Sequence, residues 1–173
     1  MNDACANAAT ITTARGEEFR IRRATGRDVP AVVRLLADDM LGRDREGDTT
    51  PSALAPYDAA FALIDRNPNA FLGVVCDTAD PSTILGTFQL DLLPGLSRGG
   101  TTRLQMEAVR IASTLTGSGV GSAVFDWIHD YGRRHGATLV QLTTDEQRSD
   151  AHRFYEKLGY LASHEGMKRS LES

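Results

Sequence analysis

Residues 104–136 read LQMEAVRIASTLTGSGVGSAVFDWIHDYGRRHG, and this stretch decides the fold. An apolar segment that contains one acidic residue, Glu107, runs into a loop with alternating glycines over 117–121. An amphipathic helix is expected to follow, from about Val120 to Arg134. A glycine turn between a strand and a helix lets backbone N–H groups and the helix N-terminus surround a phosphate. The stretch therefore predicts binding of a molecule that carries a pyrophosphate.

The glycine loop can be compared with three known kinds of loop. A P-loop needs a lysine followed by serine or threonine after its last glycine, and here Gly121 is followed by Ser122 and Ala123, which excludes it. A dinucleotide fingerprint needs glycine or alanine where this chain has Ser122, and it opens the first strand–helix–strand unit rather than a late one. A glycine-rich turn that binds no ligand stays open.

The elements around this stretch follow from apolar periodicity and turn residues. Helices are expected to begin near residues 30, 56, 120 and 150, and strands are expected at 19–22, 70–77, 83–92, 103–112, 138–144, 160–163 and 166–171. The order β-α-α-β-β-β-α-β-α-β predicts an α/β (α+β) fold with a mixed sheet and helices on both faces. The unit over 103–144 should be a right-handed parallel crossover. Residues 1–18 are interpreted as a flexible N-terminal tail.

Composition restricts the classes of partner. A chain of 173 residues fits one domain with a substantial core. The formal net charge is -4 and no long basic run occurs, so nucleic acid is not an expected partner. No apolar run is long enough to span a bilayer, and the N-terminus does not read as a secretory signal. Cys5 and Cys76 lack metal or redox spacing, no metal site is expected, and a reducing cytoplasm is the default compartment.

Two motifs in order carry a family resemblance. The first is the loop Thr116-Gly117-Ser118-Gly119-Val120-Gly121, and the second is RSDAHRFYEKLGY at 148–160. Together they resemble the GNAT superfamily of N-acetyltransferases, whose central motif is Arg or Gln, two residues, Gly, one residue, and Gly or Ala. The resemblance implies acetyl-CoA as co-substrate and a single N-acetyltransferase domain over 19–173. It also implies a mostly antiparallel central sheet of about six to seven strands in which the fourth and fifth splay apart.

The first position of the central motif departs from the family. The family's Arg or Gln there helps to hold the pyrophosphate, and this chain has Thr116. The threonine hydroxyl and the backbone amides are then expected to hold the phosphates, and Arg110, Arg133 or Arg153 are the candidates to supply the missing cation.

The resemblance also implies site residues. Glu107 matches the frequent acidic position and would serve as the general base, since an alkylammonium with a pKa near ~10.4 must lose a proton before it attacks. Tyr155 matches the general acid that protonates the leaving thiolate. Alternation places Glu107, Val109 and Ile111 on one face, and the backbone of the latter two would pair with the pantetheine arm. The implied acetyl-CoA contacts are Val109, Arg110, Ile111, Thr116, Gly117, Ser118, Gly119, Val120, Gly121, Ser122 and Phe154.

Each of these two roles has a structural alternative. Glu107 can be an exposed strand carboxylate paired with Arg103 or Arg110, and Tyr155 can be a core aromatic residue. The function expected is acetyl transfer from acetyl-CoA to the primary amine of a small molecule. A non-catalytic CoA-binding or regulatory module, or acetylation of a protein or peptide amine, is the alternative. The charged loop over 42–55 is expected to be mobile. Acidic residues near the first helix would favour a cationic acceptor, against which Arg43 and Arg45 count, and a homodimer is left open.

Overall fold

The computed structural model describes residues 8–38 and 49–171. The chain divides into two compact units, residues 1–141 and residues 142–173, and each is described by itself. Among the described residues no helix is both long enough and apolar enough to cross a membrane.

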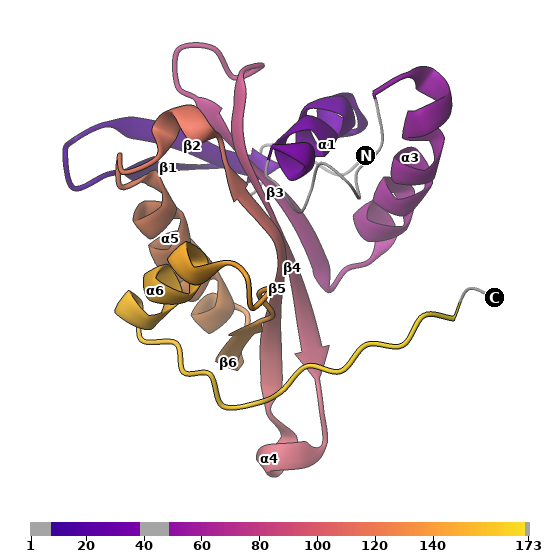
Figure 1. Cartoon of the computed structure of the whole chain (residues 1–173), viewed down its shortest axis with the longest axis vertical. Coiled ribbons are helices and arrows are strands. Elements are labelled where there is room, and N and C mark those ends of the chain that lie inside the picture. The colour runs from indigo at the N-terminus through magenta and orange to yellow at the C-terminus, as the bar shows by residue number, and fades with distance from the viewer. Residues whose placement is uncertain (1–7, 39–48, 172–173) are drawn as a thin grey trace. The chain divides into compact units, whose positions relative to one another are not determined.

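Within residues 8–38 and 49–171, six strands form one sheet in the order in which they occur along the chain (Figure 1). The four neighbouring pairs from the first strand to the fifth are antiparallel. The mixed α/β fold with a mostly antiparallel sheet is therefore confirmed, and the splay of the family's fourth and fifth strands stays a prediction. The strands are β1 (Ala9–Thr12), β2 (Glu18–Arg23), β3 (Ala70–Asp77), β4 (Ile84–Pro94), β5 (Thr102–Ile111) and β6 (Ala137–Leu142).

Helices of the first unit cover both faces of this sheet (Figure 1). Two long helices, α1 (Val29–Ala37) and α3 (Pro51–Arg66), lie on one face, and α5 (Val120–Arg134) lies on the other. The shorter elements are η1 (Gly26–Asp28), α4 (Ser97–Gly100) and η2 (Ser113–Leu115). The second unit contains α6 (Ser149–Lys157). The predicted arrangement of helices on both faces is confirmed.

The central strand β3 is buried on both faces, which explains its uninterrupted apolar sequence. On the α5 face, the ring of Phe71 lies 5.7 Å from that of Trp127 and 5.3 Å from that of Tyr131. On the opposite face, Leu72 and Val74 pack in a cluster that includes Val32 of α1. Alternate residues of one strand therefore anchor helices on opposite sides of the sheet.

The first pair of strands corrects the tail prediction. Residues 9–12 form β1 and pair with β2, and the side chain of Ile11 is buried. The prediction of a flexible tail over 1–18 is therefore wrong for residues 9–12. Residues 1–7 lie outside the described residues. The stretch ATIT is short but rich in β-branched residues, which favour strands once a neighbouring strand supplies hydrogen bonds.

Two other expectations are corrected in the same way. The second helix begins at Pro51 rather than near Pro56, which lies inside it; residues 42–48 of the predicted mobile loop lie outside the described residues. Residues 160–171 contain no strand, so the two predicted final strands are wrong. Apolar side chains such as Leu161 and Met167 suggested strands there, but both are more than four-fifths exposed, and a β pattern without a paired neighbour does not form a ladder.

Candidate active site

Strand β5 contains a bulge beside Glu107. Thr87 of β4 pairs with Arg110, and Gln89 pairs with Glu107, so two residues of β5 stand opposite the single residue Phe88. The extra residue is accommodated at Ala108, whose φ is 53°, in the left-handed region that favours glycine. A bulge with a strained first residue redirects the strand, and such strain of about 1–3 kcal/mol is concentrated at functional sites.

The bulge changes which side chains share a face. Partners across a strand pair point to the same side of the sheet, so Glu107 and Arg110 share the face of Gln89 and Thr87. Ile111 pairs with Gly86 and points to the other face. The predicted common face of Glu107 and Ile111 is therefore wrong, because the extra residue shifts the period-2 alternation.

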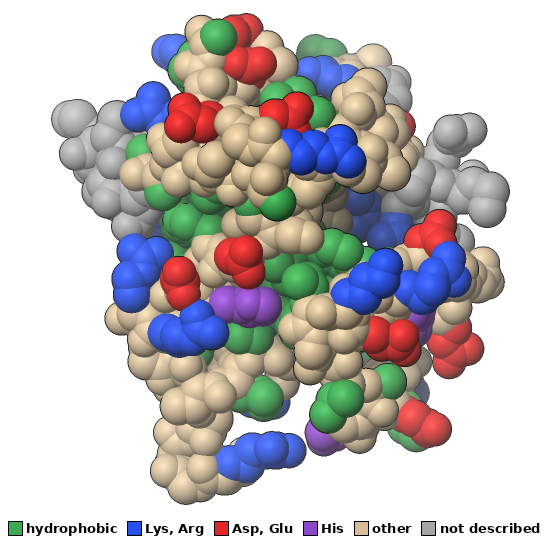
Figure 2. Space-filling model, turned by 90° about the vertical axis from the view of Figure 1, so that its left-hand side faces the viewer, with side chains coloured by type: hydrophobic (Ala, Val, Ile, Leu, Met, Phe, Trp, Pro, Cys, Tyr) green, Lys and Arg blue, Asp and Glu red, His purple; other side chains and the backbone are tan. Residues whose placement is uncertain are grey.

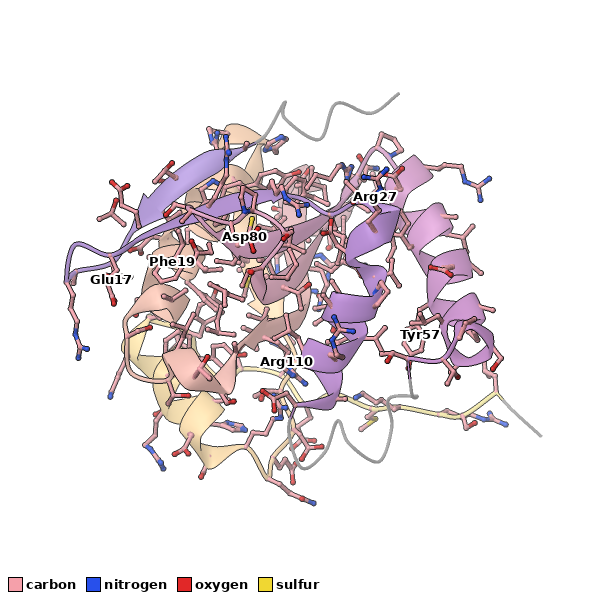
Figure 3. The ribbon with its side chains drawn as sticks, turned by 90° about the horizontal axis from the view of Figure 1, so that it is seen from above. Glu17, Phe19, Arg27, Tyr57, Asp80 and Arg110 are labelled. Carbon is pink, nitrogen blue, oxygen red and sulfur yellow. The ribbon has the colours of Figure 1, made fainter. Side chains whose placement is uncertain are left out.

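Glu107 is exposed on the face of the sheet opposite α5. The side-chain amide of Gln105 donates a 2.7 Å hydrogen bond to its Oε1. Arg110 lies three positions further on, and its Nη1 donates to the carbonyl oxygen of Val109 at 2.7 Å. Seen from above, Arg110 lies toward the side of the sheet where α1 runs (Figure 3). A carboxylate that is both exposed and fixed by a neutral donor is suited to accept a proton from a ligand.

The glycine loop follows β5 after the short helix η2. Gly117 and Gly119 have φ values of 76° and 91°, and Gly119 is the N-cap of α5. Ser118 holds the turn, since its Oγ donates to the carbonyl of Leu115 at 2.6 Å and accepts from the backbone N–H of Val120 at 3.3 Å. The predicted glycine loop at a helix N-terminus is confirmed.

The loop leaves backbone donors at the start of α5. The N–H of Ala123 bonds to the carbonyl of Gly119 at 3.2 Å and closes the first turn. The N–H groups of Gly121 and Ser122 precede the first intrahelical hydrogen bond. Helix geometry gives them no acceptor within the helix, so they can bind an anion. Val120 differs, because its side chain is fully buried and its N–H bonds to Ser118. Thr116 and Gly117 are exposed at the entrance of the loop.

The candidate arginines lie in different places. Arg133 is near the C-terminal end of α5, about 20 Å along the helix from Val120 at 1.5 Å per residue, and it forms an ion pair with Asp130. It is therefore too far away to replace the missing motif residue. Arg153 pairs with Asp150 in the second unit. Arg110 remains next to the bulge.

The hairpin between β1 and β2 adds an element that sequence reasoning missed. A Cβ on Gly119 would lie 3.7 Å from the Cβ of Thr13, so the hairpin turn abuts the glycine loop. Oγ1 of Thr13 accepts the N–H groups of Arg15 and Glu17 at 3.3 and 3.2 Å, which fixes the turn. Glu17 marks this turn in Figure 3. The hairpin thus brings Arg15, a cation within the predicted tail, to the neighbourhood of the loop.

The second unit places Phe154 and Tyr155 on α6. Their ring centroids are 5.7 Å apart, and the ring of Tyr155 lies 5.9 Å from that of Tyr160 in an edge arrangement. Burial, together with the nearby Tyr155, raises the pKa of Tyr160 above its usual value. Glu107 and the glycine loop belong to the first unit and Tyr155 to the second, so a joint role of Glu107 and Tyr155 stays a prediction.

Comparisons with known proteins agree with this geometry. The model of the Acetyltransferase (GNAT) family matches residues 31–160, which is more than half of the chain. An aminoalkylphosphonate N-acetyltransferase of Salmonella typhimurium is 35% identical over 60 residues, a match that spans 35% of this chain and only 39% of that protein.

Two solved structures show the same fold. A protein described as a transcriptional regulator from Bacillus halodurans C-125 is 41% identical, with a TM-score of 0.81 over 87% of this chain and 98% of its own. An acetyltransferase from Trypanosoma brucei is 24% identical, with a TM-score of 0.69 over 88% of this chain and 99% of its own. The chain therefore belongs to the GNAT family of acetyltransferases.

Proposed function

We propose that this protein transfers the acetyl group of acetyl-CoA to the primary amine of a small molecule. The observation that carries the proposal is the bulge at Ala108. The bulge lies next to the exposed carboxylate of Glu107, on the strand that leads through η2 to the glycine loop of α5. One short segment therefore supplies both a base and an anion-binding turn, which is what acetyl transfer from a pyrophosphate-bearing donor needs.

The donor would be held by backbone groups. The N–H groups of Gly119, Gly121 and Ser122 would bind the pyrophosphate, and Ser118 would keep the turn in shape through its two hydrogen bonds. Thr116 and Gly117 would lie at the entrance of the glycine loop, next to the pyrophosphate. Val109 and Ile111 would offer backbone groups to the pantetheine arm, and Phe154 would contribute an apolar surface. Arg110 or Arg15 would supply the cation that the motif lacks at Thr116.

The chemistry would follow from these positions. Acetyl-CoA supplies an acyl thioester, in which the carbonyl carbon is open to attack. Glu107 would take a proton from the acceptor ammonium, and the amine nitrogen would then form the new bond to the carbonyl carbon. A backbone N–H at the bulge would donate to the carbonyl oxygen as it gains charge, an effect worth about 3 kcal/mol per donor. Tyr155 would give its proton to the sulfur as the carbon–sulfur bond breaks, and the nitrogen, which still carries one proton too many after its attack, would lose that proton to water as the amide forms.

The acceptor is proposed to be a small molecule for two reasons. The curated relative is an aminoalkylphosphonate N-acetyltransferase, and its 60 matched residues are 35% identical to this chain. Acidic and basic side chains are interspersed on the face shown in Figure 2, rather than gathered by sign as a surface for a charged macromolecule would have them. The cytoplasm stays the expected compartment.

A second candidate is a CoA-binding module without catalysis. The 41% identical structure is described as a transcriptional regulator, and Thr116 departs from the family motif. The two candidates differ in one measurable respect, because only the enzyme releases CoA when an amine is supplied.

The decisive experiment combines binding and turnover. The purified protein is first tested for a thermal shift with acetyl-CoA, where saturation at a hundredfold excess over Kd stabilises by about 2.7 kcal/mol. Release of CoA is then measured over amino acids, polyamines, amino sugars, aminophosphonates, aminoglycosides and peptides, and mass spectrometry identifies the acetylated product. A shift with an acetylated small amine supports the proposal. A shift without product for any amine favours the CoA-binding module, and acetylated peptide alone contradicts the small-molecule acceptor.

A matched pair of glycine variants tests the loop. Gly119→Glu places a side chain and a negative charge in the loop, and it should abolish the thermal shift. Gly136→Glu changes a glycine that also has a positive φ, 76°, with open space around its Cβ, but at the other end of α5. It carries the same backbone strain and should keep the shift. Equal loss of the shift in both variants would refute the assignment of the loop.

A further inference from the structure

The turn between β1 and β2, residues 13–17, lies next to the glycine loop. Strand β1 contacts α5, the helix that begins at this loop. Thr13 follows β1 directly and is only 4% exposed, and a Cβ built on Gly119 would lie 3.7 Å from its Cβ. Because Gly119 is the N-cap of α5, the turn borders the backbone donors at the start of that helix.

Hydrogen bonds hold this turn in one shape. Oγ1 of Thr13 accepts the N–H groups of Arg15 and Glu17 at 3.3 and 3.2 Å, and the N–H of Thr13 donates to the carbonyl of Glu17 at 2.9 Å. The N–H of Gly16 donates to the carbonyl of Thr13, also at 2.9 Å. The backbone of Arg15 is therefore one hydrogen bond away from the residue that borders the loop.

Arg15 is the cation of this turn, and its charge is not neutralised. Its side chain is exposed, and within residues 8–38 and 49–171 its guanidinium forms no ion pair or hydrogen bond. A guanidinium binds two phosphate oxygens at once, on a side chain long enough to reach past its own turn. The turn also carries the exposed Glu17, whose charge opposes an anion, so the effect of Arg15 has to be measured against it.

Arg110, the candidate cation beside the bulge, points to the other face of the sheet. It pairs with Thr87, which pairs with Val74, and Val74 packs with Val32 of α1. Cross-strand partners share a face, so Arg110 lies on the α1 side, whereas α5 covers the opposite side. Figure 3 shows Arg110 toward α1. Arg15 is therefore the candidate cation that borders the start of α5.

We propose that the β1–β2 turn forms one wall of the donor site and that Arg15 binds the pyrophosphate of acetyl-CoA from that wall. This inference rests on the proposed function, because it takes the glycine loop as the pyrophosphate site. The N–H groups of Gly121 and Ser122 are neutral donors, and the guanidinium adds the positive charge that Thr116 lacks. The pyrophosphate is assigned rather than the 3′-phosphate, because the turn meets the loop at Gly119, immediately before those donors.

The test measures the Kd of CoA and of dephospho-CoA, which keeps the pyrophosphate and lacks the 3′-phosphate, by titration calorimetry with the full chain. Arg15→Gln should raise both Kd values by the same factor, about three- to tenfold, since an exposed charged contact is weaker than a buried one. The factor should shrink as salt is added, because ions screen exposed charges. The unfolding temperature without ligand should not change, because the Arg15 side chain is exposed.

Two variants of the same hairpin are matched controls. Arg20→Gln removes an exposed cation from β2, but Arg20 pairs with Cys76, two positions from Val74, and so faces the α1 side. Both Kd values should stay at those of the unchanged protein. Glu17→Gln removes a negative charge from the turn itself and should lower both Kd values or leave them unchanged.

The possible results separate this inference from the proposed function. Unchanged Kd values in Arg15→Gln would overturn the role of Arg15, and so would an equal rise in Arg20→Gln or a rise in Glu17→Gln. A rise for CoA alone would place Arg15 at the 3′-phosphate and overturn the assignment to the pyrophosphate. A rise that salt does not alter, or a lower unfolding temperature without ligand, would overturn it in favour of a structural role. Failure of the unchanged protein to bind either ligand would contradict the proposed function itself.

Discussion

The substitution Gly73→Ala tests the packing of aromatic side chains between the sheet and α5, the helix that begins at the glycine loop. Gly73 lies in β3, and a Cβ built there would be 2.4 Å from Cζ of Phe88 and 2.9 Å from Cε1 of Phe71. Both rings are at most 1% exposed, and Phe88 also contacts Trp127 of α5 at 5.6 Å between centroids. The rings have no open space to move into, so the added methyl group must displace them or the helix above.

The magnitude follows from overpacking and chain entropy. Inserting a methyl group into a well-packed core costs about 1–3 kcal/mol, and replacing glycine by alanine returns about 0.4–1 kcal/mol through the unfolded chain. The net loss of unfolding free energy is therefore about 1–2 kcal/mol. For a chain of this length that lowers Tm by about 2–8 °C. Because Trp127 belongs to the helix that begins at the glycine loop, KM for acetyl-CoA should rise as well.

Thermal and urea unfolding of matched variants measure this loss. Gly166→Ala is the control, since nothing lies within 4 Å of its Cβ position and its φ is not positive; it should change stability by less than about 0.5 kcal/mol. Adding Phe88→Leu removes the atoms closest to the new methyl group, so Gly73→Ala should cost less in that background. A Gly73→Ala protein as stable as the unchanged chain, or an equal cost in both backgrounds, would refute the packing argument.

Three further predictions concern the bulge, the catalytic roles and an ion pair. Proline cannot adopt the φ of 53° found at Ala108, so Ala108→Pro should remove the bulge and abolish turnover. Ala108→Gly should relieve about 1 kcal/mol of backbone strain and keep the activity. Unfolding curves measure the stability of both variants, and CoA release measures their turnover. Glu107→Gln should lower the rate of acetyl transfer most at low pH, where free amine is scarce. Tyr155→Phe should lower turnover while leaving the acetyl-CoA thermal shift intact. Full activity in both variants would contradict the assigned roles. Burial opposes ionisation of Asp28, but two hydrogen bonds from Arg22, at 2.7 and 2.9 Å, and those from Thr25 outweigh it and hold the pKa of Asp28 below its usual value. Because the pKa of Asp28 is lower in the folded than in the unfolded protein, the ionised carboxylate stabilises the fold at pH values above the unfolded-state pKa. This contribution is lost as the pH falls through the folded-state pKa. Asp28→Asn should therefore lower the unfolding free energy by about 1.5–3 kcal/mol at pH 7 and make stability less dependent on pH below about pH 4.

Local patterns were enough to predict the glycine loop and the helix after it. Gly117, Gly119 and the apolar stripe of α5 are properties of one continuous segment, and their physical causes, positive φ and helical periodicity, act within a few residues. The uninterrupted apolar run of β3 and the turn residues between elements are local in the same sense. The mixed α/β fold and the family therefore followed from the sequence.

The bulge depends on pairing between strands that are distant in sequence. Nothing in the segment around Ala108 marks an extra residue, because the register is set by β4, about twenty positions earlier. The side assigned to Ile111 was wrong for that reason. Strand β1 escaped detection similarly, since four residues gain strand structure only when β2 supplies their hydrogen bonds.

The neighbours of Glu107 across the sheet show the same division. Gln89 and Asp91 are unremarkable in the sequence, and they lie beside Glu107 and Gln105 only because of the antiparallel register of β4 and β5. Residue type and spacing along one segment determine what a turn or helix can do, because those interactions span a few residues. Which side chains meet across a sheet is decided by hydrogen bonding between strands, and that pairing placed Asp91 diagonally across from Glu107.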